Sequence, residues 1–305
     1  MRVISIGECM VEFLRQDDGL WRQGFAGDSL NVAWAMRALM PQGAVVDYLT
    51  RVGTDAMSEA MLAMLRGAGI GTGSVTRDLR RTVGLYTIQT DAEGERSFSY
   101  WRSDSAARGL AEDPRQLAAA LDGADLVYLS GITLAILPPA DRAQLLAVLG
   151  ARGARPFRVA FDPNIRPRLW PDLGAAAKAV TQMAALADIL LPTHDDEAQA
   201  FGDADALATL ARYRALGVPE VVVKDGRQPT RFDCEGVAGA RAVDPVAAVD
   251  TTGAGDSFNG AYLSARLGNA SVAEALAVAQ RVSAAVVGQR GALVAPALLR
   301  AAAQG

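Results

Sequence analysis

The chain has 305 residues, half of them hydrophobic and 21% charged, which is enough apolar material for a sizeable core and too little charge for a disordered chain. Thirty basic and thirty-four acidic residues give a net charge of −4, so no overall basic field is available to hold nucleic acid. Cys9 and Cys234 are far apart and His194 is the only histidine, which excludes a disulfide framework, a thiolate zinc site and a multi-histidine metal site.

Short apolar runs alternate with helical patterns along most of the chain, as is typical of βαβ units and a largely parallel sheet. We predict buried strands at residues 3–6, 45–50, 126–129, 159–161, 189–191 and 220–223. Amphipathic helices are predicted at residues 58–66 and 141–149, and a capping box at Ser271 and Glu274 opens a helix that ends near Gly288.

Nothing in the sequence indicates a membrane or an export signal. The longest stretch without a charged residue, 126–140, is too short to cross a bilayer. The first residues contain no basic segment followed by a hydrophobic one. We therefore expect a cytoplasmic protein with neither a membrane nor a nucleic acid as a partner.

Residues 82–90 and 95–103 interrupt the alternation, because they resemble two strands joined by the turn 91–94. Along the second strand Phe98, Tyr100 and Arg102 share one face, since side chains alternate with a period of two. A hairpin that projects from a parallel sheet covers or pairs with something, so we expect a lid over a cleft. An ordinary edge hairpin fits the same pattern.

The glycine-rich stretch 250–260 is the strongest candidate for chemistry. Its glycines permit a tight turn, and residues 257–266 have a helical pattern, so backbone amides at a helix N-terminus would face an anion. Asp256 would lie beside that anion, where a carboxylate can accept a proton from an attacking hydroxyl. A glycine-rich turn with Asp256 as the helix N-cap fits the spacing equally well. The P-loop pattern and a GxGxxG after the first strand are both absent.

Three motifs resemble those of the PfkB, or ribokinase-like, carbohydrate kinases: DTTGAGD at 250–256, GDSLNVA at 27–33 and RVGTD at 51–55. The resemblance covers essentially the whole chain. It implies an α/β fold, a ribokinase-like three-layer αβα sandwich with a mostly parallel central sheet and a small β lid. Residues 1–305 would form a single kinase domain whose discontinuous lid comes from about 8–25 and 82–105.

The resemblance also implies ATP and Mg²⁺ as cofactors and a γ-phosphoryl transfer to a sugar hydroxyl. Asp256 would be the catalytic base, and the amides of Gly253, Ala254 and Gly255 would form the anion hole. By the same carry-over, the residues that contact sugar hydroxyls are Gly27, Asp28 and Asn31. Asp28 could equally be only the N-cap of a helix that runs through Met40.

Further stretches resemble the 2-keto-3-deoxygluconate kinases of this family, namely 7–12 (GECMVE), 94–102, 128–132 and 161–170. A sugar acid carries a carboxylate, and a guanidinium is the side chain best matched to it. Arg102 and Arg166 are therefore the candidates for binding the carboxylate, and Tyr86 and Tyr100 would line the sugar pocket. The alternatives are an exposed hairpin charge for Arg102, a surface salt bridge for Arg166 and cross-strand packing for the tyrosines.

On the nucleotide side, the resemblance places Lys224 and Gly226 beside ATP, with Asn164 and Arg166 reaching the phosphates. Many family members hold magnesium with an Asn-x-x-Glu motif. Here His194 occupies the asparagine position, so Glu197 alone remains as a metal-site residue that acts through water. The resemblance also suggests a homodimer formed through the lid.

These observations predict an ATP-dependent kinase for the terminal (6-) hydroxyl of 2-keto-3-deoxygluconate, with Asp256 as a general base for which an ordinary carboxylate pKa suffices. A kinase of a neutral sugar such as fructose, or of the galactonate epimer, is the alternative. A nucleoside kinase would need a base-stacking pocket that the sequence does not indicate. A catalytically silent sugar-binding regulator would not need an intact Asp256.

Overall fold

The computed structural model describes residues 1–16, 18–90, 96–152 and 157–305. Its central sheet has eight strands in the order β14-β13-β12-β11-β10-β9-β1-β4. Their bounds are β1 Arg2–Ile6, β4 Val45–Leu49, β9 Leu126–Ser130, β10 Arg158–Asp162, β11 Ile189–Leu190, β12 Glu220–Val223, β13 Thr230–Cys234 and β14 Val237–Arg241. The strands from β4 to β12 pair in parallel, and β13 and β14 extend the sheet in antiparallel fashion. All six predicted strands are confirmed, whereas this antiparallel edge was not predicted.

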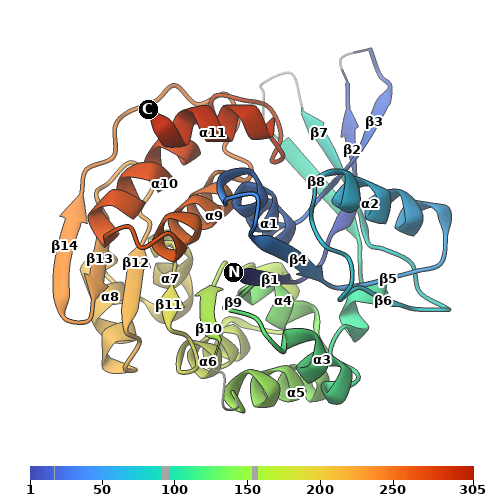
Figure 1. Ribbon diagram of the computed structural model, residues 1–305, viewed down its shortest axis with the longest axis horizontal. Helices are drawn as coiled ribbons and strands as arrows, with labels where there is room; N and C mark the ends of the chain where they lie inside the picture. Colours follow the sequence, from blue (N-terminus) through green and yellow to red (C-terminus); the bar gives the residue numbers. More distant parts are fainter. Residues whose placement is uncertain (17, 91–95, 153–156) are drawn as a thin grey trace.

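Helices cover both faces of this sheet (Figure 1). One face carries α1 Asp28–Leu39, α2 Ala56–Gly67, α9 Ala254–Leu267, α10 Val272–Val287 and α11 Pro296–Gln304. The other face carries α3 Pro114–Leu121, α4 Gly131–Ile136, α5 Pro139–Gly150, α6 Leu173–Ala184, α7 His194–Phe201 and α8 Ala206–Ala215. Along β1, Val3 packs into the first core and Ile4 into the second, because successive side chains of a strand point to opposite faces. The three-layer αβα architecture is thereby confirmed.

A separate four-stranded sheet, in the order β3-β2-β7-β8, stands apart from the central sheet at the upper right of Figure 1. Its strands are β2 Met10–Arg15, β3 Trp21–Ala26, β7 Leu85–Thr90 and β8 Arg96–Trp101. The predicted hairpin is confirmed, since β7 and β8 are antiparallel with Tyr86 opposite Tyr100; residues 91–95 of the connection lie outside the described residues. The remaining short elements are β5 Arg51–Val52, β6 Thr76–Arg77, η1 Ala106–Gly109 and η2 Pro167–Leu169.

The N-terminal ends of α9 and α1 decide between the roles predicted for Asp256 and Asp28. Helix α9 begins at Ala254, three residues before the predicted start, so Asp256 lies within its first turn and is not its N-cap; Gly253 is, with a φ of 74°. Gly27 is the N-cap of α1 and no side chain caps this helix, which removes the purely capping role considered for Asp28. The predicted capping box of Ser271 and Glu274 is present at α10.

A glycine brings α9 close to α1. A Cβ at Gly260 would lie 2.6 Å from Cβ of Ala35 and 2.8 Å from the carbonyl oxygen of Val32, so a larger residue would push the helices apart. The close crossing places the first turn of α9 beside that of α1. Among the described residues, no helix is both long and apolar enough to cross a membrane.

Candidate active site

The first turns of α1 and α9 are joined by a direct contact. Nδ2 of Asn31 donates a hydrogen bond of 2.8 Å to Oδ2 of Asp256. Nδ2 of Asn164 donates one of 2.8 Å to Oδ2 of Asp28, so four of the predicted residues form two linked pairs. Asn164 has a φ of 35°, a left-handed conformation that is strained for a non-glycine residue and that concentrates at functional sites.

Lys224 lies in a buried polar network at the carboxyl ends of the strands. Its Nζ donates to Oδ2 of Asp162 at 2.7 Å and to Oδ1 of Asn259 at 3.1 Å. Nδ2 of Asn259 donates to the same Asp162 oxygen at 2.6 Å. A Cβ at Gly255 would lie 3.8 Å from Nζ of Lys224, so the ammonium group stands beside the backbone of the predicted anion hole.

Asp162 and Asn259 were not among the predicted site residues. Asp162 ends a buried strand, and the ends of parallel strands are where ligands bind in open α/β sheets. Asn259 follows Asp256 by three residues and is fully buried. A polar residue on the inner face of a helix was the available signal, because a buried amide needs partners.

The loop before α9 is held in place by Asp250. Its Oδ1 accepts hydrogen bonds from the backbone N–H and the hydroxyl of Thr252, at 3.0 and 2.7 Å. Its Oδ2 accepts one of 2.6 Å from the N–H of Gly291. The amide of Ala254 donates to the carbonyl of Thr251 at 3.2 Å. The turn is therefore fixed at the N-terminus of a 14-residue helix, where the helix dipole favours an anion.

The pKa of Asp256 is raised from 3.8 to about 7. The causes that raise this pKa are burial, which is the largest, and the negative charges of Asp28 and Asp162. The hydrogen bond from Asn31 and the positive charge of Lys224 lower it in part. An ordinary carboxylate pKa was expected to suffice for this base; the raised value arises first from burial and then from the nearby charges of Asp28 and Asp162. Such a site favours the arrival of further positive charge, which would lower the pKa again.

The small sheet presents aromatic side chains on one face. Tyr86 and Tyr100 stack with their ring centres 5.7 Å apart, and Phe98 stacks on Tyr100 at 6.3 Å. This confirms the cross-strand packing considered for the tyrosines, which is compatible with a pocket role because Tyr100 remains half exposed. The hydroxyl of Tyr86 donates a hydrogen bond to Glu12.

Arg102 is not an exposed hairpin charge, since its side chain is only 11% exposed and forms an ion pair with Glu8.

Arg166 and Glu197 are both engaged by other side chains of the protein. The half-exposed Arg166 forms a 3.0 Å salt bridge with Asp196, which matches the surface alternative. Glu197 is fully buried, and its Oε2 accepts hydrogen bonds of 2.7 Å from both Arg212 and Tyr213. Burial raises the pKa of Glu197 to about 7 despite these donors.

This carboxylate does not fit the magnesium role in the arrangement seen here. Solvent does not reach Glu197, and within the described ranges no group of three candidate ligands could hold a metal ion. Nδ1 of His194, at the position of the family's asparagine, lies 3.3 Å from the hydroxyl of Thr209.

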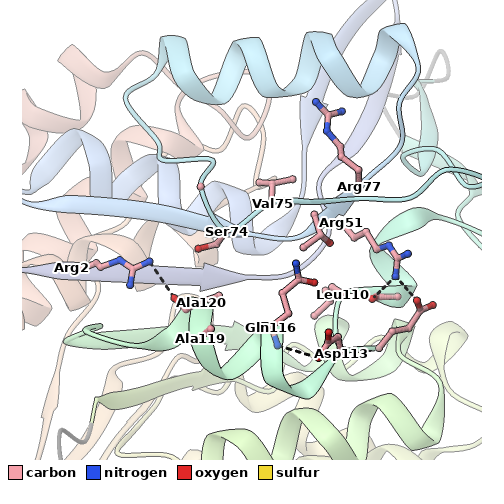
Figure 2. A pocket seen from close by; sticks show the side chains of 14 residues that line it. Arg2, Arg51, Ser74, Val75, Arg77, Leu110, Asp113, Gln116, Ala119 and Ala120 are labelled. Carbon is pink, nitrogen blue, oxygen red and sulfur yellow. Dashed lines mark hydrogen bonds and ion pairs between the residues drawn. The ribbon is translucent and has the colours of Figure 1, made fainter.

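A cavity of about 880 Å³ lies elsewhere, between α3 and the β5–β6 pair (Figure 2). Its lining includes Arg2 and Arg51 but none of the predicted site residues. Arg2 donates a hydrogen bond to the carbonyl oxygen of Ala120 (Figure 2). Arg51 donates one to the carboxylate of Glu112. Because none of the predicted site residues lines it, this cavity is not assigned to the chemistry.

A comparison with known families decides the affiliation, because the pfkB family carbohydrate kinase profile matches residues 1–297. The chain belongs to this family. It is 40% identical to the 2-dehydro-3-deoxygluconokinase of Dickeya dadantii over 299 residues, 96% of each chain.

Solved structures agree on the fold of this PfkB-family protein. The 2-dehydro-3-deoxygluconokinase of Thermotoga maritima superposes with a TM-score of 0.85 at 22% identity, covering 100% of this chain and 98% of that one. The fructokinase of Xylella fastidiosa, solved with bound ATP, gives 0.84 at 22% identity and covers 99% and 98%. At such identities the likeness establishes the ribokinase-like fold alone.

Proposed function

We propose that this PfkB-family protein is an ATP-dependent kinase that phosphorylates the terminal (6-) hydroxyl of 2-keto-3-deoxygluconate, giving 2-keto-3-deoxy-6-phosphogluconate. The observation that carries the chemistry is the contact of Asn31 with Asp256 at the N-terminus of α9, beside Lys224. The sugar acid is favoured because the Dickeya relative bears that activity's name and because Arg102, next to the stacked tyrosines, can pair with a carboxylate.

In the proposed reaction Asp256 accepts the proton of the attacking hydroxyl while Asn31 fixes the orientation of its carboxylate. The bond from the sugar oxygen to the γ-phosphorus forms as the bond to the β-phosphate bridging oxygen breaks, releasing ADP. The amides of Gly253, Ala254 and Gly255 and the ammonium of Lys224 stabilise the charge on the transferred group. The nucleotide substrate in this proposal is MgATP.

The other predicted residues have supporting roles in this proposal. Gly27, Asp28 and Asn31 face the sugar hydroxyls, and Tyr86, Tyr100 and Arg102 close over the sugar from the small sheet, which acts as the lid of a single kinase domain. Asn164, Arg166, Lys224 and Gly226 serve the nucleotide phosphates. Exposed apolar side chains of the small sheet, among them Trp21 and Trp101, support a homodimer formed through the lid.

A neutral sugar such as fructose, or the galactonate epimer of the sugar acid, is the alternative substrate, since a fructokinase shares the fold. The test is ADP release from MgATP with 2-keto-3-deoxygluconate, its galactonate epimer, fructose, ribose and adenosine side by side. We expect the highest kcat/KM with the gluconate acid and a product phosphorylated at the terminal carbon by NMR. A preference for fructose would overturn the substrate but keep the kinase, and no turnover with any acceptor would overturn both.

A further inference from the structure

The segment 7–12 contains two glutamates that have no part in the proposed chemistry, and each contacts a predicted sugar-side residue of the hairpin. Glu8 forms an ion pair with Arg102, and its side chain is fully buried. Glu12 accepts a hydrogen bond from the hydroxyl of Tyr86. Neither glutamate is a candidate base, because Asp256 already occupies the position at the N-terminus of α9.

The backbone brings Glu8 to the edge of the active site. A Cβ at Gly27, the N-cap of α1, would lie 2.2 Å from the carbonyl oxygen of Glu8, so a glycine is required there for the two segments to touch. Helix α1 carries Asn31, the partner of Asp256. Glu8 therefore links the catalytic end of α1 to the small sheet.

A second glycine makes room for the ion pair itself. A Cβ at Gly84 would lie 2.9 Å from Oε1 of Glu8 and 3.2 Å from Cβ of Arg102. The amide of Val11 donates to the carbonyl of Gly84 at 2.8 Å, which fixes the two segments relative to each other. Nε of Arg102 is buried and has no hydrogen-bond partner among the described residues.

Glu12 holds Tyr86 in a comparable way. The two residues are register partners on the parallel strands β2 and β7. Because the hydroxyl of Tyr86 donates its hydrogen bond to Glu12, the phenolic oxygen keeps its acceptor capacity for a substrate hydroxyl. The same phenol ring stacks on Tyr100, so its orientation is fixed from two sides.

We propose that Glu8 and Glu12 are positioning residues for the sugar acid, with Glu8 fixing the guanidinium of Arg102 and Glu12 fixing the phenol of Tyr86. This inference rests on the proposed function. A free arginine side chain has many rotamers, and holding one edge of its fork lowers the entropy lost when another edge binds a carboxylate. Glu8 also balances the buried charge of Arg102 when the sugar is absent, because a buried cation without a partner would be destabilising.

The test compares Glu8→Gln and Glu12→Gln with Glu220→Gln as the matched control. Glu220 forms a similarly buried ion pair with Arg266 at 2.8 Å, between β12 and the end of α9. We expect Glu8→Gln to raise the KM for 2-keto-3-deoxygluconate about tenfold, with kcat and the KM for MgATP nearly unchanged. Glu12→Gln should raise the same KM less. Glu220→Gln should lower Tm and leave both KM values unchanged.

A double-mutant cycle with Arg102→Met separates positioning from a general structural effect. In the Arg102→Met background, Glu8→Gln should have no further effect on the KM for the sugar acid. An unchanged or lowered KM in the single variant, or additive effects in the cycle, would overturn the inference. Failure of the wild type to phosphorylate the sugar acid would instead overturn the proposed function, and it is seen before any variant is measured.

Discussion

Asn31 and Asp256 are 225 positions apart in the chain, yet their side chains share a hydrogen bond of 2.8 Å. The contact exists because α9 crosses α1 at Gly260, where the helices come too close for a Cβ. It gives a candidate base a fixed orientation, and it partly offsets the charge repulsion from Asp28 that raises the pKa of Asp256. Several expected outcomes depend on this pair.

Asp256→Asn should reduce kcat by about three orders of magnitude, because a general base contributes roughly 10²–10⁴ to the rate. The amide keeps the shape of the side chain and can still accept the hydrogen bond from Asn31. MgATP affinity, measured by calorimetry, should stay within about threefold of wild type. Substantial turnover in this variant would remove the role assigned to Asp256.

The pH profile of kcat/KM should have an acid limb near pH 7, because the base must be deprotonated and its pKa in the empty protein is about 7. Asn31→Ala should move this limb to higher pH, since the lost hydrogen bond stabilised the charged form. Profiles measured from pH 5.5 to 9 check this. A limb that stays in place in Asn31→Ala would show that the contact does not tune the base.

The same carboxyl should cost stability at alkaline pH. The pKa of Asp256 lies at about 7 in the folded protein against a usual value of 3.8, so its stabilising contribution is present below pH 4 and is lost as the pH rises through 7. Asp256→Asn should therefore raise Tm by about 3–6 °C at pH 8 and change it little at pH 4. Thermal unfolding without ligands at both pH values is the measurement, and an equal shift at both would contradict the linkage.

Substitutions of Arg102 and Arg166 should change the KM of different substrates. Arg102→Met should raise the KM for 2-keto-3-deoxygluconate by about 10- to 100-fold, because a charge-assisted contact to a carboxylate is lost. Arg166 is half exposed and paired with Asp196, so Arg166→Met should act mainly on the KM for MgATP. Steady-state kinetics with both substrates varied distinguishes the two. Equal losses of fructose and sugar-acid affinity in Arg102→Met would count against the carboxylate contact.

Much of this arrangement could be predicted from local pattern. The six buried strands are continuous apolar runs, and the glycine-rich turn before α9 has a distinctive spacing. The antiparallel edge formed by β13 and β14 was missed because all its residues except the buried Thr230 are partly buried or exposed, so the two strands have no apolar run. The raised pKa of Asp256 could not be predicted either, since it arises from burial of the carboxyl and from the charges of Asp28 and Asp162, all of which depend on the tertiary fold.

The surroundings of Glu197 do not suit the magnesium role that the family resemblance implies for this residue. Its carboxylate is fully buried and bonded to Arg212 and Tyr213, and Arg212 also pairs with Asp203 at 2.7 Å. Glu197→Gln can still accept both hydrogen bonds through its amide oxygen, so the Mg²⁺ concentration for half-maximal activity should stay within about twofold of wild type. Glu197→Leu removes the acceptor and leaves the buried hydroxyl of Tyr213 without its partner, whereas Arg212 keeps Asp203; the unpaired hydroxyl should lower Tm clearly. Kinetics over a range of Mg²⁺ concentrations at fixed ATP checks both variants, and a tenfold higher Mg²⁺ requirement in Glu197→Gln would restore the metal role that the buried carboxylate now argues against.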